Sequence, residues 1–175
     1  MNQDLKSSKA EFNLKSSEEQ IKSSIDKYLI DLNDYEIKRD HKESNHGILN
    51  YACDKYYGMV YVAKTFLLKY SLQNRSSILH EISNLFLQHP TLFHINGFSY
   101  EDFEGNNNLT IITNYMKNGS ISSNLPINTN SQKQIILIGI TRAMMLLHEQ
   151  NIIHRNLKAE NVLIDDNYHP LLNDF

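Results

Sequence analysis

The chain has 175 residues, of which 41% are hydrophobic, and this favours one packed domain with a tail over a disordered chain. A net charge of −3, with scattered basic residues, argues against a nucleic-acid-binding surface. The single cysteine, Cys53, excludes an internal disulfide, and no apolar segment has the length of a signal peptide or a membrane span, so we expect a cytoplasmic protein.

Residues 1–33 are polar and rich in serine and lysine, and the triplet KSS occurs at 6–8, 15–17 and 22–24. Apolar residues recur in this segment at a weakly helical spacing. We therefore expect a partly helical leader, with its helix near 17–31, that stands apart from the domain after it.

The composition of the sequence changes at Tyr35, after which β-branched and aromatic residues become frequent. Residues 35–54 predict two strands around a polar turn that holds Gly47, and a turn at Gly58 leads into a third strand that ends near Lys64. Residues 75–89 have helical spacing, with Ser76 or Ser77 as the N-cap and Pro90 as the stop.

Two further strands are predicted at 92–101 and 108–116, separated by the loop DFEGNNN. A turn with Gly119 then opens a short helix at Ser120, and residues 131–151 predict a long amphipathic helix with Ser131 as its cap. Short strands follow at 162–164 and 171–172. Five strands around one helix, followed by helices, indicate an α+β fold.

Four short motifs carry the chemistry, and their order matters more than any one of them. VAK ends at Lys64, Glu81 follows in the predicted helix, HRNLKAEN spans 154–161, and DF closes the chain at 174–175. In this order and spacing the chain resembles the first half of a eukaryotic protein kinase domain, over roughly residues 35–175.

The resemblance implies a protein-kinase-like fold with three parts. Residues 1–33 are the leader, and 34–114 are an N-lobe with a five-stranded antiparallel sheet and one αC helix. Residues 115–175 are the hinge and the beginning of a helical C-lobe, truncated after the DF of the D-F-G motif. Lys158 and the segment NYMKNGS resemble serine/threonine kinases of the tyrosine-kinase-like branch.

The resemblance also implies ATP and Mg²⁺ as cofactors. Lys64 would contact the α- and β-phosphates while Glu81 holds it, and Lys158 would neutralise the transferring phosphate. Asn161 and Asp174 offer hard oxygen ligands that suit Mg²⁺. The other nucleotide-binding positions implied by the resemblance are Gly47, Leu49, Ala63, Thr113 at the gatekeeper position, Asn114, Met116 and Leu163. An apolar spine would join Leu85, Ile95, His154 and Phe175.

Three residues depart from the family pattern. In the phosphate-covering loop Lys42 and Ser44 replace glycines and only Gly47 remains, so we expect weakened or reshaped nucleotide binding. Asn156 stands where the family has its catalytic aspartate. An amide can accept a hydrogen bond from a hydroxyl but cannot take its proton, and loss of a positioned acid or base typically costs about 10² to 10⁴ in rate.

Three functional readings follow from this pattern. The first is a pseudokinase that binds ATP and Mg²⁺ and has a signalling or scaffold role towards a protein partner. The second is an active or weakly active serine/threonine kinase that phosphorylates protein hydroxyls. The third is a non-functional fragment, because the chain ends at Phe175 and the long helix then exposes an apolar face.

Overall fold

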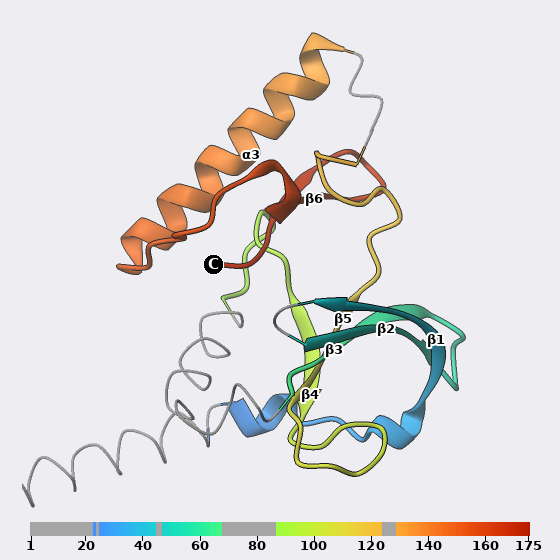
Figure 1. Cartoon of the computed structure of the whole chain (residues 1–175). Helices are drawn as coiled ribbons and strands as arrows, with labels where there is room; N and C mark the ends of the chain where they lie inside the picture. The colour runs from blue at the N-terminus through green and yellow to red at the C-terminus, as the bar shows by residue number, and fades with distance from the viewer. Residues whose placement is uncertain (1–22, 24, 45–46, 68–86, 124–128) are drawn as a thin grey trace, which may run out of the picture. The chain divides into compact units, whose positions relative to one another are not determined.

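The computed structural model describes residues 23, 25–44, 47–67, 87–123 and 129–175 (Figure 1). These fall in two compact units, one made of residues 1–83 and 96–113 and the other of 84–95 and 114–175. Most of the predicted αC helix, including Glu81 and Leu85, lies outside the described residues. Its last three predicted residues, 87–89, are described and are not helical.

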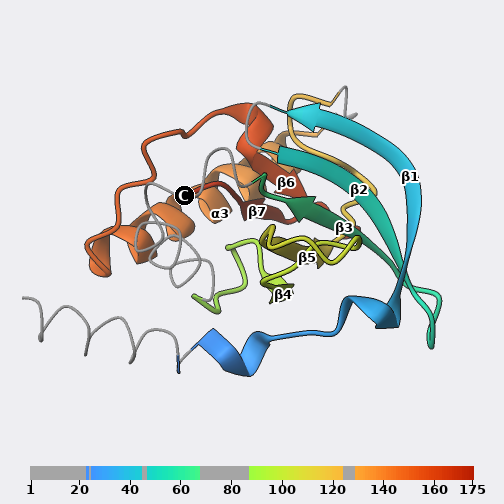
Figure 2. The ribbon, with the colours of Figure 1, turned by 60° about the horizontal axis from the view of Figure 1, so that its bottom comes forward.

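The first unit is built on a five-stranded sheet with the strand order β1-β2-β3-β5-β4, and the pairs β1–β2 and β2–β3 are antiparallel (Figure 2). This sheet confirms the predicted α+β, kinase-like fold class. Its strands are β1 (Tyr35–Ser44), β2 (Gly47–Asp54), β3 (Val60–Thr65), β4 (Ile95–Ser99) and β5 (Thr110–Asn114).

The segment before β1, residues 25–34, forms a strap along the edge of this sheet. A 3₁₀ turn, Asp26–Tyr28, ends at Leu29, whose ψ of 134° is extended. Leu29 forms a parallel bridge to Phe98 of β4, and the Ile30 N–H donates to the Phe98 carbonyl at 3.0 Å. The predicted helix therefore does not reach residue 31, because the edge strand offers unpaired backbone groups that an extended segment satisfies.

The strap covers one face of the sheet and closes its core. Ala52, Ala63 and Ile112 are fully buried and form a cluster against apolar side chains of the strap and its surroundings. These neighbours are Ile30, Leu32, Tyr35, Tyr61 and Phe103. The sheet therefore has one face packed under the strap and a second face left for other roles.

The second unit packs helix α3 (Asn130–Glu149) against the hairpin of β6 (Val162–Ile164) and β7 (Pro170–Leu172). The α3 N-cap is Thr129, whose side chain accepts from the Gln132 N–H while the Gln132 side chain reaches back to the Thr129 backbone. The predicted cap, Ser131, was wrong, because this Thr-x-x-Gln capping box satisfies two orphan donors together. The core joins Leu92, Ala143, Leu147, Val162 and Leu172.

The short helix predicted at Ser120 is also absent from the described part of the segment. Ser120 forms an antiparallel bridge to Leu163, and the Ile121 N–H donates to the Val162 carbonyl at 2.9 Å. The serine hydroxyls instead bond to each other, with 2.7 Å between the Oγ atoms of Ser120 and Ser122. Serine that finds such local partners favours a turn over a helix interior.

One side of α3 keeps apolar side chains in contact with solvent, as the sequence predicts. These side chains are 43–64% exposed and belong to Ile135, Leu137, Ile138 and Met145. Among the described helices, none is long and apolar enough to cross a membrane.

Gly47→Ala is expected to lower the free energy of unfolding by about 2 kcal/mol or more. Gly47 has a φ of 140°, and a β-carbon there would collide with the backbone carbonyl of Thr65. Gly58→Ala is the matched control, because Gly58 also has positive φ but open space around it. Urea unfolding of the full chain measures both variants, and equal losses would contradict the collision argument.

Candidate functional site

The face of the sheet away from the strap carries the predicted phosphate-contacting lysine. Lys64 of β3 lies directly opposite Leu49 of β2, and such cross-strand partners project to the same face. Thr113 follows Ile112, which belongs to the strap core, so Thr113 also projects to the Lys64 face. The Thr113 hydroxyl donates to the Val62 carbonyl at 3.4 Å. Leu49, Lys64 and Thr113 therefore share one face.

Ala63 does not share that face. It is fully buried in the strap core beside Ala52, and neighbouring residues of a strand point to opposite sides. Ala63 and Leu49 therefore project to opposite faces of the sheet, so the structure does not bring these two predicted nucleotide-binding residues together. Val62, two residues before Lys64, lies on the Lys64 face, because every second residue of a strand projects to the same side. The two-residue period of the strand could have identified Val62 from the sequence.

Lys64 and Gly47 each have a described local role. The Lys64 ammonium lies 4.8 Å from the centroid of the Phe66 ring, a cation–π distance. Gly47 pairs with Ser44 at the start of β2 and allows close approach to Thr65. Since Glu81 lies outside the described residues, its pairing with Lys64 stays a prediction.

The hinge residues and Leu163 belong to the second unit. Asn114 is exposed, and the Met116 carbonyl accepts the Gly119 N–H at 3.0 Å within a turn. Leu163 lies between Val162 and Ile164, which are buried, so Leu163 projects away from the helix core. The nucleotide contacts predicted for these three residues stay predictions.

His154 and Phe175 lie together, as the predicted spine requires. Their ring centroids are 6.3 Å apart with the planes at 72°, and His154 is only 3% exposed. Neither ring nitrogen of His154 has a hydrogen-bond partner in the part of the chain that the structure describes. His154 therefore acts here as a buried apolar contact beneath the loop that follows it.

Two amide side chains converge on one carboxylate oxygen of Asp174, and we call Asn156, Asn161 and Asp174 the amide cluster. The Asn156 Nδ2 donates to Asp174 Oδ2 at 2.8 Å, and the Asn161 Nδ2 donates to the same oxygen at 3.2 Å. The Asn161 Nδ2 also donates to the Asn156 carbonyl at 2.8 Å. Because a carboxylate only accepts hydrogen bonds, both amide nitrogens must face it.

The backbone brings these residues together through two unusual turns. Arg155 has a φ of 60° and Asp174 a φ of 63°, a left-handed conformation that is uncommon outside glycine. The 3₁₀ turn Ala159–Asn161 then directs Asn161 inwards, where it is 8% exposed. Lys158 precedes this turn in extended conformation, with an exposed side chain.

The cluster suits a cation that arrives with phosphate oxygens better than a metal centre of its own. No group of three or more His, Cys, Asp or Glu residues that could hold a metal is found among the described residues. Asp174 supplies a carboxylate, and Asn161 supplies an amide oxygen. Mg²⁺ is typically bound through one or two carboxylates, several waters and substrate phosphates, so the two predicted ligands fit this cation.

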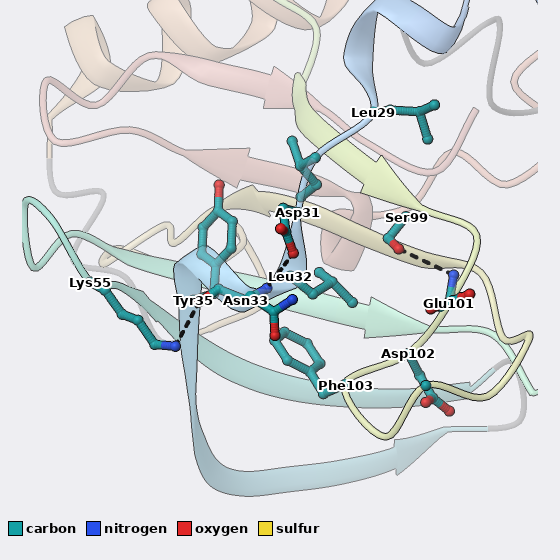
Figure 3. Close-up of a pocket in the computed structure, with 12 residues that line it drawn as sticks. Leu29, Asp31, Leu32, Asn33, Tyr35, Lys55, Ser99, Glu101, Asp102 and Phe103 are labelled. Carbon is teal, nitrogen blue, oxygen red and sulfur yellow. Dashed lines mark hydrogen bonds between the residues drawn. The ribbon is translucent and has the colours of Figure 1, made fainter.

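A separate cavity of about 570 Å³ lies within the first unit, beside the strap (Figure 3). Leu32 and Phe103 lie next to each other in its wall, and the Lys55 ammonium donates to the Asn33 carbonyl at 2.6 Å. None of the predicted site residues lines it. The cavity therefore belongs to the packing of the strap against the loop that holds Phe103, and not to the Lys64 face.

Asp102 organises that loop. Its carboxylate accepts from the side chain of Asn108 at 2.7 Å and from the backbone N–H groups of Glu104 and Asn106, both at 2.9 Å. Burial alone would raise the pKa of Asp102, but the hydrogen bonds from Asn108, Asn106 and Glu104 outweigh it and lower the pKa below its usual value.

Comparison with known proteins places the chain among protein kinases. The family model of the protein kinase domain matches residues 43–175. A probable leucine-rich repeat receptor-like serine/threonine-protein kinase of Arabidopsis thaliana is 32% identical over 117 residues, covering 60% of this chain and 11% of that protein. A putative serine/threonine-protein kinase of Helianthus annuus is 30% identical over 116 residues, covering 60% and 46%. Ephrin type-B receptor 4b of Danio rerio is 33% identical over 121 residues, covering 66% and 12%. The chain thus matches less than half the length of each of these relatives.

Asn161→Ala is expected to lower the free energy of unfolding by about 1–3 kcal/mol, because it removes the two hydrogen bonds that the buried Asn161 side chain donates to the Asn156 carbonyl and to Asp174. Asn167→Ala is the control, at an exposed position in the β6–β7 turn, and is expected to change little. Chemical denaturation measures both, and an unchanged Asn161→Ala variant would show that the described contacts do not stabilise the loop.

Asp102→Asn is expected to destabilise the chain at neutral pH and to do so less as the solution becomes acidic. The folded-state pKa of Asp102 lies below the unfolded value of 3.8, so its contribution is present above 3.8 and is lost as pH falls through the folded pKa. Denaturation of wild type and variant at neutral pH and below pH 3.8 tests this. Glu104→Gln is the control, since Glu104 is exposed in the same loop.

Proposed function

Because the chain belongs to the protein kinase domain family, we propose that it binds ATP with Mg²⁺ and transfers phosphate poorly or not at all. The observation that carries this proposal is the side chain of Asn156, which stands where the family has its catalytic aspartate, the proton acceptor, and donates an N–H to Asp174. The expected role is that of a pseudokinase, in signalling or as a scaffold for a protein partner.

The Lys64 face supports nucleotide binding. Phosphoryl transfer and phosphate binding depend on charge neutralisation and positioning, and Lys64 supplies a positive charge on the same face as Leu49 and Thr113. In the second unit, the Asn161 Nδ2 donates to Asp174 Oδ2 at 3.2 Å, and we propose that these two residues supply oxygen ligands to Mg²⁺. These observations, each within its own unit, support the proposed binding of nucleotide and cation.

Asn156 removes the group that would receive a proton. A protein hydroxyl that attacks phosphorus must lose its proton, and an amide has no basic site to accept it at neutral pH. One Asn156 N–H is donated to Asp174, and the Asn156 Oδ1 remains to accept a hydrogen bond from a hydroxyl. Since the transition state of phosphoryl transfer is loose, positioning alone supports a slow residual reaction.

A weakly active serine/threonine kinase is the second candidate, favoured by Lys158 in the loop and by the serine/threonine kinases among the similar proteins. Under this reading Lys158 neutralises the transferring phosphate, and a protein hydroxyl is the acceptor. We propose a cytoplasmic location under both readings, since the single cysteine leaves no internal disulfide.

Nucleotide binding is tested by titrating the full chain with the non-hydrolysable analogue AMP-PNP in the presence of Mg²⁺. Lys64→Ala is expected to weaken binding about tenfold or more, because a charged phosphate contact is lost. Lys133→Ala, at an exposed position on α3, is the matched control and should bind as wild type does. A folded wild-type chain that shows no binding would refute the proposal.

Phosphate transfer is tested with a generic protein substrate. Asn156→Asp is expected to raise the rate about 10² to 10⁴-fold by restoring the proton acceptor. Asn151→Asp is the control, since Asn151 is likewise an exposed asparagine in the same unit. A wild-type rate equal to that of Asn156→Asp would favour the active-kinase candidate instead.

A further inference from the structure

We propose that Asn156 is a positioning residue whose side-chain N–H takes the place on Asp174 that a divalent cation would otherwise occupy. The hydrogen bonds of the amide cluster are then complete without a cation, and Mg²⁺ adds little to nucleotide affinity. This inference rests on the proposed nucleotide binding for its second part only; its first part concerns the cation and the chain alone.

The geometry at Asp174 is the first step. Its Oδ2 receives two N–H groups, from Asn156 at 2.8 Å and from Asn161 at 3.2 Å. Two donors use both lone pairs of a carboxylate oxygen, and hydrogen bonds to a charged acceptor are the strong class. A cation that binds Oδ2 must therefore displace one of these two N–H groups, and the Asn156 bond is the shorter of the two.

The charge at position 156 is the second step. An aspartate at position 156 would place its carboxylate within hydrogen-bonding distance of the Asp174 carboxylate. Two such negative charges need a cation or a shared proton between them. An amide instead presents a positive N–H edge to Asp174. With an aspartate at position 156, a cation would be needed to offset the two negative charges. With Asn156, the amide N–H hydrogen-bonds to Asp174 and no cation is needed.

Asn161 is the third step, because it ties the loop to Asp174 independently of any cation. Its Nδ2 is shared between Asp174 and the Asn156 carbonyl, and its own carbonyl accepts the Asn173 N–H at 2.8 Å. The left-handed residues Arg155 and Asp174 are held within this set of bonds. Hydrogen bonds between protein groups therefore hold the loop in place without a cation.

The first test uses thermal unfolding of the full chain without nucleotide, in EDTA and in Mg²⁺. In EDTA, Asn156→Asp and Asn156→Ala are expected to unfold about 2–4 °C below wild type, since both lose the donor to Asp174. Added Mg²⁺ is expected to raise the midpoint of Asn156→Asp and to leave wild type unchanged.

Two comparisons keep this test decisive. Asn151→Asp adds the same charge at another exposed position of the unit and should gain nothing specific from Mg²⁺. Asn156→Ala removes the donor without adding charge, so it remains informative if the aspartate variant fails to fold. A wild-type chain stabilised by Mg²⁺ as strongly as Asn156→Asp would overturn the proposal.

The second test measures AMP-PNP affinity in EDTA and in Mg²⁺. The ratio of the two affinities is expected to be near one for wild type and about tenfold larger for Asn156→Ala, in which the cation no longer competes with a charge-assisted bond. Equal ratios in the two proteins would overturn the inference and leave nucleotide binding standing. Absence of binding in both buffers would refute the proposed function, while the thermal test would still decide the role of Asn156.

Discussion

The arrangement of the catalytic loop depends on one carboxylate oxygen that can only accept hydrogen bonds. Asp174 Oδ2 draws in the side chains of Asn156 and Asn161, and the adjacent Asn173 N–H bonds the Asn161 carbonyl. The left-handed turns at Arg155 and Asp174 are compatible with this convergence. Hydrogen bonds to this exposed carboxylate thus help to hold a loop whose backbone has little regular structure of its own.

The two units preserve different parts of the kinase design to different degrees. The sheet keeps Lys64, Leu49 and Thr113 on one face, because strand pairing and alternation leave no other choice. In the loop, the Asn156 amide donates a hydrogen bond to Asp174 at the position where the family has a proton-accepting aspartate. Under the proposed function, nucleotide binding and proton transfer therefore depend on different residues.

Much of the fold followed from the sequence because its signals were local and repeated. The turn glycines, the strand periodicity and the order of Lys64, Asn156, Asn161 and Asp174 each pointed to the same family, and the sheet bears this out. The motif alone did not separate Ala63 from Leu49, which strand alternation places on opposite faces of the sheet. The N-cap of α3 lies two residues upstream of the predicted Ser131, since Thr129 forms a capping box with Gln132 three residues later.

Contacts between distant segments were beyond the reach of such signals. Nothing in the strap's composition shows that Leu29 and Ile30 pair with Phe98, because the partner supplies the open backbone groups. In the same way, Asn156 appears in the sequence as a missing acid. Only its position beside Asp174 shows that the amide is also a donor.

Because of the strap, the folded unit begins earlier in the chain than the residues matched by the family model. The family match begins at residue 43, inside β1, whereas the chain is already engaged with the sheet at Leu29. A protein trimmed to the matched residues would lose most of β1 and uncover Ala52, Ala63 and Ile112. The boundary of the family match and the boundary of the folded unit thus differ in this chain. A shortened version made for expression has to keep the strap.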